Sequence, residues 1–211
     1  MDFSQQCFQE NELLINNKYF KYYLSPILFK NNFKHGFFTK TSSEINLSIL
    51  SNHLNLNKRN CALNQIHSNQ IVFASKTKEN KKVESDGIIS DKHNQNLWIY
   101  TADCMPILFA DKRKRYVAAI HCGRKGLENK IIKNLIKNFN NIGCLNEDLL
   151  VAIGPSISKK NYSIDNQTLQ DFCKQVTYKE SFDISKDAGI FSNLKTSSKS
   201  KKKNSIGLNL R

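Results

Sequence analysis

One thiol and two imidazoles close apolar segments of this chain. His67 ends the segment CALNQIH, Cys104 lies in TADCMP directly after an apolar run, and His121 follows the apolar run YVAAI. Thiolate and imidazole are ligands that zinc prefers, and a catalytic zinc site keeps one position open for water or substrate. Because each residue lies at the end of a predicted strand, the three can converge at one edge of the fold as a zinc site.

The same residues suit a second chemistry. Cys104 can act as a nucleophile whose thiol pKa is lowered by His67 or His121, without any metal. Spacing alone leaves both interpretations open, together with a third in which a buried cysteine and two hydrogen-bonded histidines have a structural role. Cys122 would point to the opposite face of the strand from His121, so we expect it in the core.

Two aspartates lie close to these residues in the sequence. Asp103 precedes Cys104 and is a candidate either for orienting a ligand histidine or for general acid and base catalysis. Asp86, in SDG, is interpreted as a turn residue first and as a site residue second.

A candidate anion site follows His121. The run GRKG places Gly123 and Gly126 around Arg124 and Lys125, directly before a predicted helix. Glycines let a backbone approach an anion, and a helix N-terminus offers free N–H groups and partial positive charge. The pattern indicates a phosphate site beside the metal, or an ordinary turn with two solvated cations.

The elements that must position these side chains are apolar runs of strand length and one amphipathic helix. A helix is predicted over 127–139 from apolar residues at helical spacing, and a second helix within 40–60. Near-continuous apolar strands indicate that both faces are covered, which favours an α/β or α+β layered fold. Strands are predicted at 61–67, 70–74, 97–102, 106–110, 116–120 and 149–153. The first two of these form a predicted hairpin.

Length and composition narrow the function classes. A chain of 211 residues fits one domain with a sizeable core. We divide it into a single catalytic domain at 1–191 and a polar Lys/Ser-rich tail at 192–211. The net charge is +14; five lysines lie within 195–204, and the others are scattered along the chain. Because no nucleic-acid-binding motif accompanies this charge, no nucleic-acid partner is expected. No apolar stretch reaches the roughly 18 residues of a membrane span, and the N-terminus does not resemble a signal peptide. We therefore expect a cytoplasmic protein without membrane contact.

Five ordered blocks resemble the laccase-like multicopper polyphenol oxidoreductase family, also described as purine nucleoside phosphorylases with adenosine deaminase activity and as peptidoglycan editing factors. The blocks are NQIHS at 64–68, DGII at 86–89, TADCMPILFAD at 101–111, VAAIHCG at 117–123 and AIGPSI at 152–157. The resemblance covers about 61–165.

The resemblance implies a single-domain layered α-β-β-α sandwich with mixed sheets. It further implies that His67, Cys104 and His121 bind zinc, with copper as the older and less favoured assignment. The implied activities are phosphorolysis of adenosine, inosine and methylthioadenosine, and deamination of adenosine, so the partners are a purine nucleoside and phosphate. Within this frame Asp103 and Lys125 are the candidate catalytic residues, and Gly123, Arg124 and Gly126 the candidate phosphate-binding residues. We expect a monomer or a dimer.

The chain also departs from the family pattern. The usual HAGWRG block reads HCGRKG, so the tryptophan is missing and Lys125 replaces an arginine, which alone offers a bidentate fork to phosphate. An N-terminal motif is reduced to TKTSS at 39–43, and a C-terminal strand and CTY block are absent. Two alternatives therefore stay open: a metal-free Cys/His hydrolase acting on an amide or peptidoglycan precursor, and a shortened, weakly active member that only binds.

Overall fold

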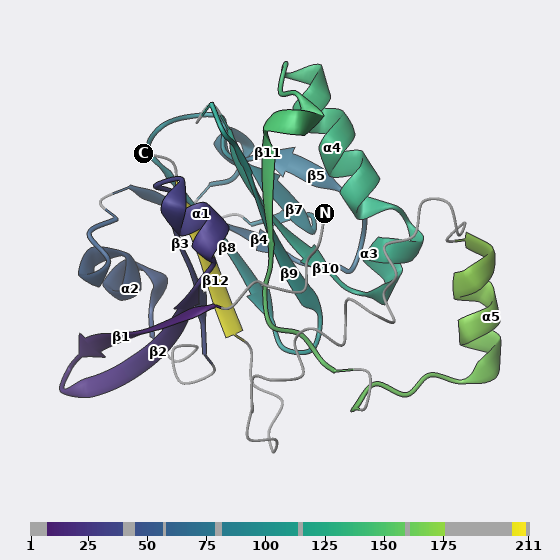
Figure 1. The fold of residues 1–211 in the computed structure, drawn as a ribbon, viewed down its shortest axis with the longest axis horizontal. Helices are drawn as coiled ribbons and strands as arrows, with labels where there is room; N and C mark the ends of the chain where they lie inside the picture. Colours follow the sequence, from purple (N-terminus) through teal and green to yellow (C-terminus); the bar gives the residue numbers. More distant parts are fainter. Residues whose placement is uncertain are drawn as a thin grey trace.

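Two β-sheets form the centre of the molecule in the computed structural model (Figure 1). The structure describes residues 8–39, 45–56, 58–78, 82–113, 116–158, 161–175 and 204–209. The larger sheet has the order β1-β2-β3-β12-β8-β4-β6, and the smaller one the order β11-β9-β10-β7-β5. Both sheets mix parallel and antiparallel pairs: β4 runs parallel to β8 and β5 parallel to β7, whereas β9 and β10 are antiparallel.

The strands of the larger sheet are β1 (Gln9–Ile15), β2 (Lys18–Leu24), β3 (Lys34–Phe38), β4 (Arg59–Asn64), β6 (Val83–Glu84), β8 (Gln95–Thr101) and β12 (Asn204–Asn209). Those of the smaller sheet are β5 (Ile71–Phe73), β7 (Gly87–Ile89), β9 (Met105–Asp111), β10 (Val117–Cys122) and β11 (Leu149–Ile153). The α-helices are α1 (Pro26–Lys30), α2 (Leu47–His53), α3 (Arg124–Glu128), α4 (Ile131–Asn141) and α5 (Asn166–Gln175). Two short 3-10 turns, η2 (Ala74–Lys76) and η3 (Asn146–Asp148), complete the described elements.

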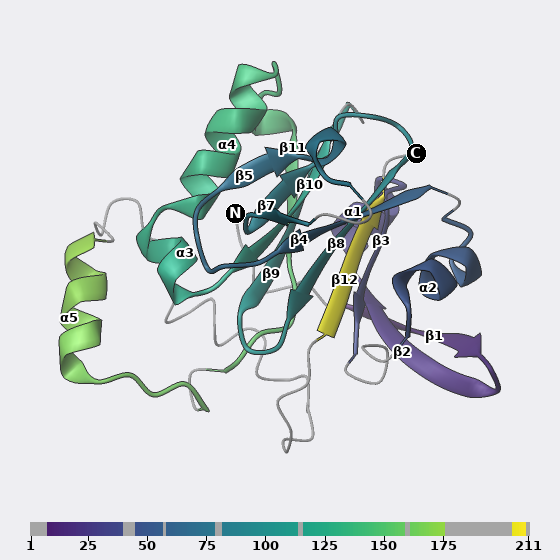
Figure 2. The same ribbon diagram turned by 180° about the vertical axis from the view of Figure 1, so that it is seen from behind.

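Three apolar clusters show how these elements are layered. The central cluster joins Leu97 and Ile99 of β8 to Leu108 of β9 and Ala119 of β10, so the two sheets pack face to face. A second cluster packs α4 against the outer face of the smaller sheet, and a third packs α2 against the larger one. Helices α2 and α4 therefore lie on opposite sides of the paired sheets, as Figures 1 and 2 show. The predicted α-β-β-α sandwich with mixed sheets is confirmed.

The central strands carry the apolar runs that the sequence shows most clearly. β9 and β10 are buried along almost their whole length, because one face meets the larger sheet and the other meets α4. These two predicted strands pair as an antiparallel hairpin, with His121 opposite Pro106 and Cys122 opposite Met105. Cys104, just before β9, therefore lies beside the end of β10. Cys122 points into the apolar cluster under α4, as expected for a core residue.

The predicted hairpin of 61–67 and 70–74 is wrong. β4 ends at Asn64 and belongs to the larger sheet, whereas β5 begins at Ile71 and belongs to the smaller one. The residues between them cross from one sheet to the other. Each strand finds a parallel partner instead, β8 for β4 and β7 for β5, which two short apolar runs cannot reveal.

The single helix predicted over 127–139 is two helices, α3 and α4. Lys130 interrupts them with a left-handed backbone, at φ 61°. Asn69 stabilises the interruption, because its side-chain amide donates to the Asn129 carbonyl while its own carbonyl accepts from Asn134. The break is thus held by the crossing between the sheets, a contact that helical periodicity does not contain. The run GRKG accordingly lies partly inside α3 rather than before a long helix.

One predicted helix is shorter than its range, and one strand occurs where none was predicted. The helix expected within 40–60 is limited to α2, because β4 begins at Arg59. Part of the segment predicted as a polar tail forms β12, which lies between β3 and β8 in the larger sheet. This strand was not predicted because the short SIGL run follows a lysine-rich segment, although it pairs with a strand on each side. The reduced motif at 39–43 lies outside the described residues, apart from Thr39.

Among the helices described, none is long and apolar enough to span a membrane.

Candidate metal centre

His67, Cys104 and His121 converge at one end of the sheets. One ligand atom from each residue lies within 4.8 Å of the others. Sγ of Cys104 is 3.8 Å from Nε2 of His67, and the two imidazole rings meet edge to face with centroids 4.7 Å apart. Nitrogen, sulfur and nitrogen donors held this closely form a group that is able to bind a metal ion. The predicted convergence of these three residues is therefore observed.

The three residues come from two connections and one strand. His67 lies in the crossing between β4 and β5, Cys104 in the turn between β8 and β9, and His121 within β10. The burial of the side chains is graded: His67 is exposed, Cys104 is intermediate and His121 is only 4% exposed. The group thus opens to solvent on the His67 side and rests on the core on the His121 side.

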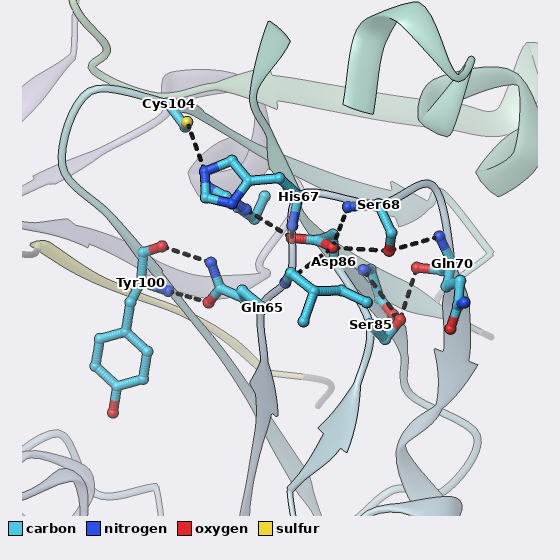
Figure 3. A network of polar contacts seen from close by, with 11 residues as sticks. Gln65, His67, Ser68, Gln70, Ser85, Asp86, Tyr100 and Cys104 are labelled. Carbon is cyan, nitrogen blue, oxygen red and sulfur yellow. Dashed lines mark hydrogen bonds and ion pairs between the residues drawn. The ribbon is translucent and has the colours of Figure 1, made fainter. Parts of the chain in front are cut away.

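Beneath the cluster lies Asp86, whose side chain is fully buried. Its Oδ1 accepts hydrogen bonds from Nδ1 of His121 at 2.8 Å and from the backbone N–H of His67 at 3.0 Å. Its Oδ2 accepts from the N–H of Ser68 at 2.6 Å, from the Ser68 hydroxyl at 2.8 Å and from the Ile66 N–H at 3.2 Å. Figure 3 shows this carboxylate between the histidine loop and the turn at Ser85.

Asp86 is the site residue that sequence reasoning underrated. Its signal was the short run SDG before an apolar strand, which is also an ordinary turn pattern. Only the tertiary structure brings this turn, between β6 and β7, against the crossing that carries His67. The orienting role considered for Asp103 thus falls to Asp86, because a carboxylate on the second nitrogen of a ligand histidine fixes its tautomer.

Asp86 and His121 shift each other's pKa values in opposite directions. Burial opposes the charge on both groups, but the hydrogen bonds from His121 and Ser68 hold the pKa of Asp86 at about 2. For His121, burial would lower the pKa, yet the contacts with Asp86 and Cys104 raise it to about 9. Burial and the neighbouring His121 lower the pKa of His67. The two imidazoles therefore differ in basicity, and Nδ1 of His121 is committed to Asp86, which directs Nε2 toward the cluster.

Gly123 is required next to the cluster for reasons of space. A Cβ at this position would lie 2.8 Å from Sγ of Cys104 and 3.2 Å from Cδ2 of His67. A side chain here would displace one of two candidate ligands. The predicted phosphate-binding Gly123 therefore also borders the metal group directly. Gly126 is buried in α3, where a Cβ would make ordinary contacts at 3.4 Å with Ile131 and the Ser68 carbonyl.

The two cations of the GRKG run are placed differently from one another. Arg124 forms an ion pair with Glu128 on the same helix, one turn further along. Lys125 is exposed. Because α3 has only 5 residues, its N-terminus is a weak source of helix dipole. Proximity to the cluster is thus observed through Gly123, while phosphate binding by Arg124, Lys125 and the two glycines stays a prediction.

Asp103 is exposed in the turn before Cys104. Its backbone carbonyl accepts from the N–H of Ile157, which ties this turn to the segment after β11. No residue in the described part of the chain forms a hydrogen bond or ion pair with its carboxylate. Asp103 therefore does not orient either histidine, and its catalytic role stays a prediction.

A family model described as multi-copper polyphenol oxidoreductase laccase matches residues 39–203. A purine nucleoside phosphorylase of Rickettsia conorii is 33% identical over 158 residues, covering 72% of this chain and 65% of the relative. A purine nucleoside phosphorylase of a Synechocystis strain is 37% identical over 106 residues, covering 47% of this chain and 40% of the relative. The chain thus spans less than two thirds of the length of these curated relatives.

Solved structures share the fold. YlmD from Geobacillus stearothermophilus superimposes with a TM-score of 0.65 at 17% identity, covering 82% of each chain. A hypothetical protein YfiH from Bacillus licheniformis superimposes with a TM-score of 0.64 at 16% identity, covering 90% of this chain and 96% of the other. At these identities the likeness concerns the fold alone.

Proposed function

The chain belongs to the multi-copper polyphenol oxidoreductase laccase family, and we propose that it is a zinc-dependent purine nucleoside phosphorylase that also deaminates adenosine. The substrates would be adenosine, inosine and methylthioadenosine, with phosphate as the second substrate and the cytoplasm as the site of action. The observation that carries the proposal is the group of His67, Cys104 and His121, supported by relatives named purine nucleoside phosphorylase.

The donor set fits zinc. Two imidazoles and one thiolate are borderline-soft ligands, and three protein ligands leave a position for water or substrate. His121 has the orienting carboxylate that ligand histidines usually carry. A zinc ion held there supplies Lewis acidity, which serves to activate water for adenosine deamination. Copper suits the same donors, but a multicopper enzyme needs further ligand clusters, and within the described residues this is the one such group found.

For phosphorolysis the residues of the chain have three tasks. Lys125 and Arg124 bind phosphate beside Gly123, with Gly123 and Gly126 allowing close approach of the backbone. A phosphate oxygen forms a bond to C1′ of the ribose while the bond from C1′ to the purine nitrogen breaks. The leaving purine takes up a proton, which we assign to Asp103, the exposed acid in the turn beside Cys104. The products are ribose 1-phosphate and the free base.

Metal analysis combined with a nucleoside assay tests the proposal. Purified protein should contain one zinc per chain, consume inosine only when phosphate is present, and release ammonia from adenosine. Cys104→Ala should abolish both zinc binding and turnover. Protein without stoichiometric zinc, together with unchanged activity of Cys104→Ala, would overturn the proposal. Stoichiometric zinc without turnover of any nucleoside would instead favour a member of the family that only binds.

A second candidate function rests on the contacts that His121 makes with Cys104 and with Asp86. A thiol next to an imidazole whose other nitrogen is bonded to a buried carboxylate is the arrangement of a Cys/His hydrolase. Such an enzyme would attack an amide or a peptidoglycan precursor without metal. A chelator separates the two functions: it removes the activity of a zinc enzyme and leaves that of a thiol hydrolase intact.

A further inference from the structure

Two crossings between the sheets run side by side beneath the candidate metal group. The first joins β4 to β5 and carries His67, and the second joins β6 to β7 and carries Asp86. They are fastened at several points: the N–H groups of Asp86 and Gly87 and the hydroxyl of Ser85 all reach the Gln70 carbonyl. β10 closes the arrangement, because the N–H of His121 donates to the Asp86 carbonyl at 2.7 Å.

The loop that carries His67 is shaped around an anion. Three successive N–H groups, from Ile66, His67 and Ser68, point at the Asp86 carboxylate. His67 itself has a left-handed backbone, at φ 59°, which is uncommon for a residue with a side chain. Successive N–H groups with a left-handed residue among them form a concave anion site. The carboxylate fills that site, so it stabilises the backbone conformation that turns His67 toward Cys104.

The same carboxylate oxygen serves both histidines. Oδ1 of Asp86 receives the backbone N–H of His67 and the ring Nδ1–H of His121. A shift of Asp86 would therefore move the loop of one ligand and release the ring of the other. Building on the proposed zinc function, we propose that Asp86 is a positioning residue that couples His67 and His121, setting the backbone of one and the ring nitrogen that the other presents.

The test compares three variants by zinc affinity and by the visible spectrum of bound Co²⁺, both measured on the full chain. Asp86→Asn keeps the shape of the side chain but replaces one acceptor oxygen by a donor. Ser68→Ala removes the hydroxyl that donates to Oδ2 and leaves every candidate ligand in place. Asp91→Asn is the matched control: Asp91 accepts from the N–H of Ser75 and from Gln95 at the opposite end of β7, without contacting a candidate ligand.

We expect Asp86→Asn to weaken zinc binding roughly 10- to 100-fold, as for other partners of ligand histidines, and to shift the Co²⁺ absorption bands. Ser68→Ala should shift the Co²⁺ bands in the same direction and weaken zinc binding about two- to fivefold. Asp91→Asn should match the unaltered protein in both measurements. A merely structural role would lower the melting temperature of Asp86→Asn without changing the Co²⁺ spectrum of the folded protein.

Each outcome decides between the two proposals. If the unaltered protein binds neither zinc nor Co²⁺, the proposed function fails and the coupling falls with it. If it binds zinc and a folded Asp86→Asn binds equally well with the same spectrum, the coupling alone is overturned. Should Asp86→Asn not fold, Ser68→Ala decides, because weaker binding supports the coupling and unchanged binding overturns it.

Discussion

His121 and Arg124 are close neighbours along the chain, yet their surroundings differ sharply. His121 is 4% exposed and is held by Asp86 through both its ring and its backbone. Arg124 lies on a five-residue helix and is paired with Glu128 from that same helix. The candidate metal group thus combines two connections and one strand that are hydrogen-bonded to one another through Asp86, whereas the ion pair of Arg124 lies within a single short helix. The candidate metal group is therefore held by the fold, whereas the proposed phosphate-binding run presents one ion-paired cation and one exposed cation, Lys125.

The largest effect should come from removing the thiolate. Cys104→Ala leaves two histidines, one of them exposed, and we expect zinc to be lost from the purified protein. Elemental analysis after dialysis measures the metal content. Cys144→Ala is the control, since Cys144 is buried in the cluster under α4. Equal zinc content in Cys104→Ala and the unaltered protein would contradict a thiolate ligand.

Filling the space at Gly123 should have the next largest effect. The added Cβ of Gly123→Ala would press on Cys104 and His67, so we expect zinc affinity to fall about tenfold. Competition with a chelating dye gives the affinity. Gly126→Ala is the matched control for metal binding, because its Cβ makes only ordinary contacts. Similar zinc affinities for the two variants would mean that Cys104 and His67 can move to accommodate a side chain at position 123 without loss of metal binding.

Removing the exposed cation should have a smaller effect, confined to phosphate. Lys125→Ala should raise the KM for phosphate about two- to fivefold and leave the KM for nucleoside unchanged, because a solvated charge contributes modestly. Steady-state phosphorolysis with each substrate varied in turn gives both constants. Lys137→Ala on the exposed face of α4 controls for the loss of one positive charge. Equal changes in both constants would argue against a phosphate role.

The smallest effect should come from freeing Arg124. Glu128→Gln removes its ion-pair partner, and we expect the KM for phosphate to fall about twofold because the guanidinium becomes available. The same kinetic assay at two ionic strengths checks this, since the gain should shrink at high salt. An increase in this KM would show that Glu128 holds Arg124 in its working position.

Several parts of the site could be predicted because the chemistry is local. Cys104 and His121 flank a hairpin of two apolar strands, so their approach follows from register alone. Covered sheets could likewise be predicted from the unbroken apolar runs of β8, β9 and β10. The residue types of the cluster also indicated a metal, because two imidazoles and a thiol form a recognisable donor set.

The candidate ligands, the buried central strands and the family can therefore all be predicted from the order of the amino acids. The approach of His67 to the other two residues depends on the packing of the sheets, because its loop crosses between them instead of closing a hairpin. The same packing makes Asp86, not Asp103, the partner of His121. Both results have one cause, since a buried carboxylate must accept hydrogen bonds from whichever donors the fold brings to it. Those donors come from segments that have no pattern in common along the chain.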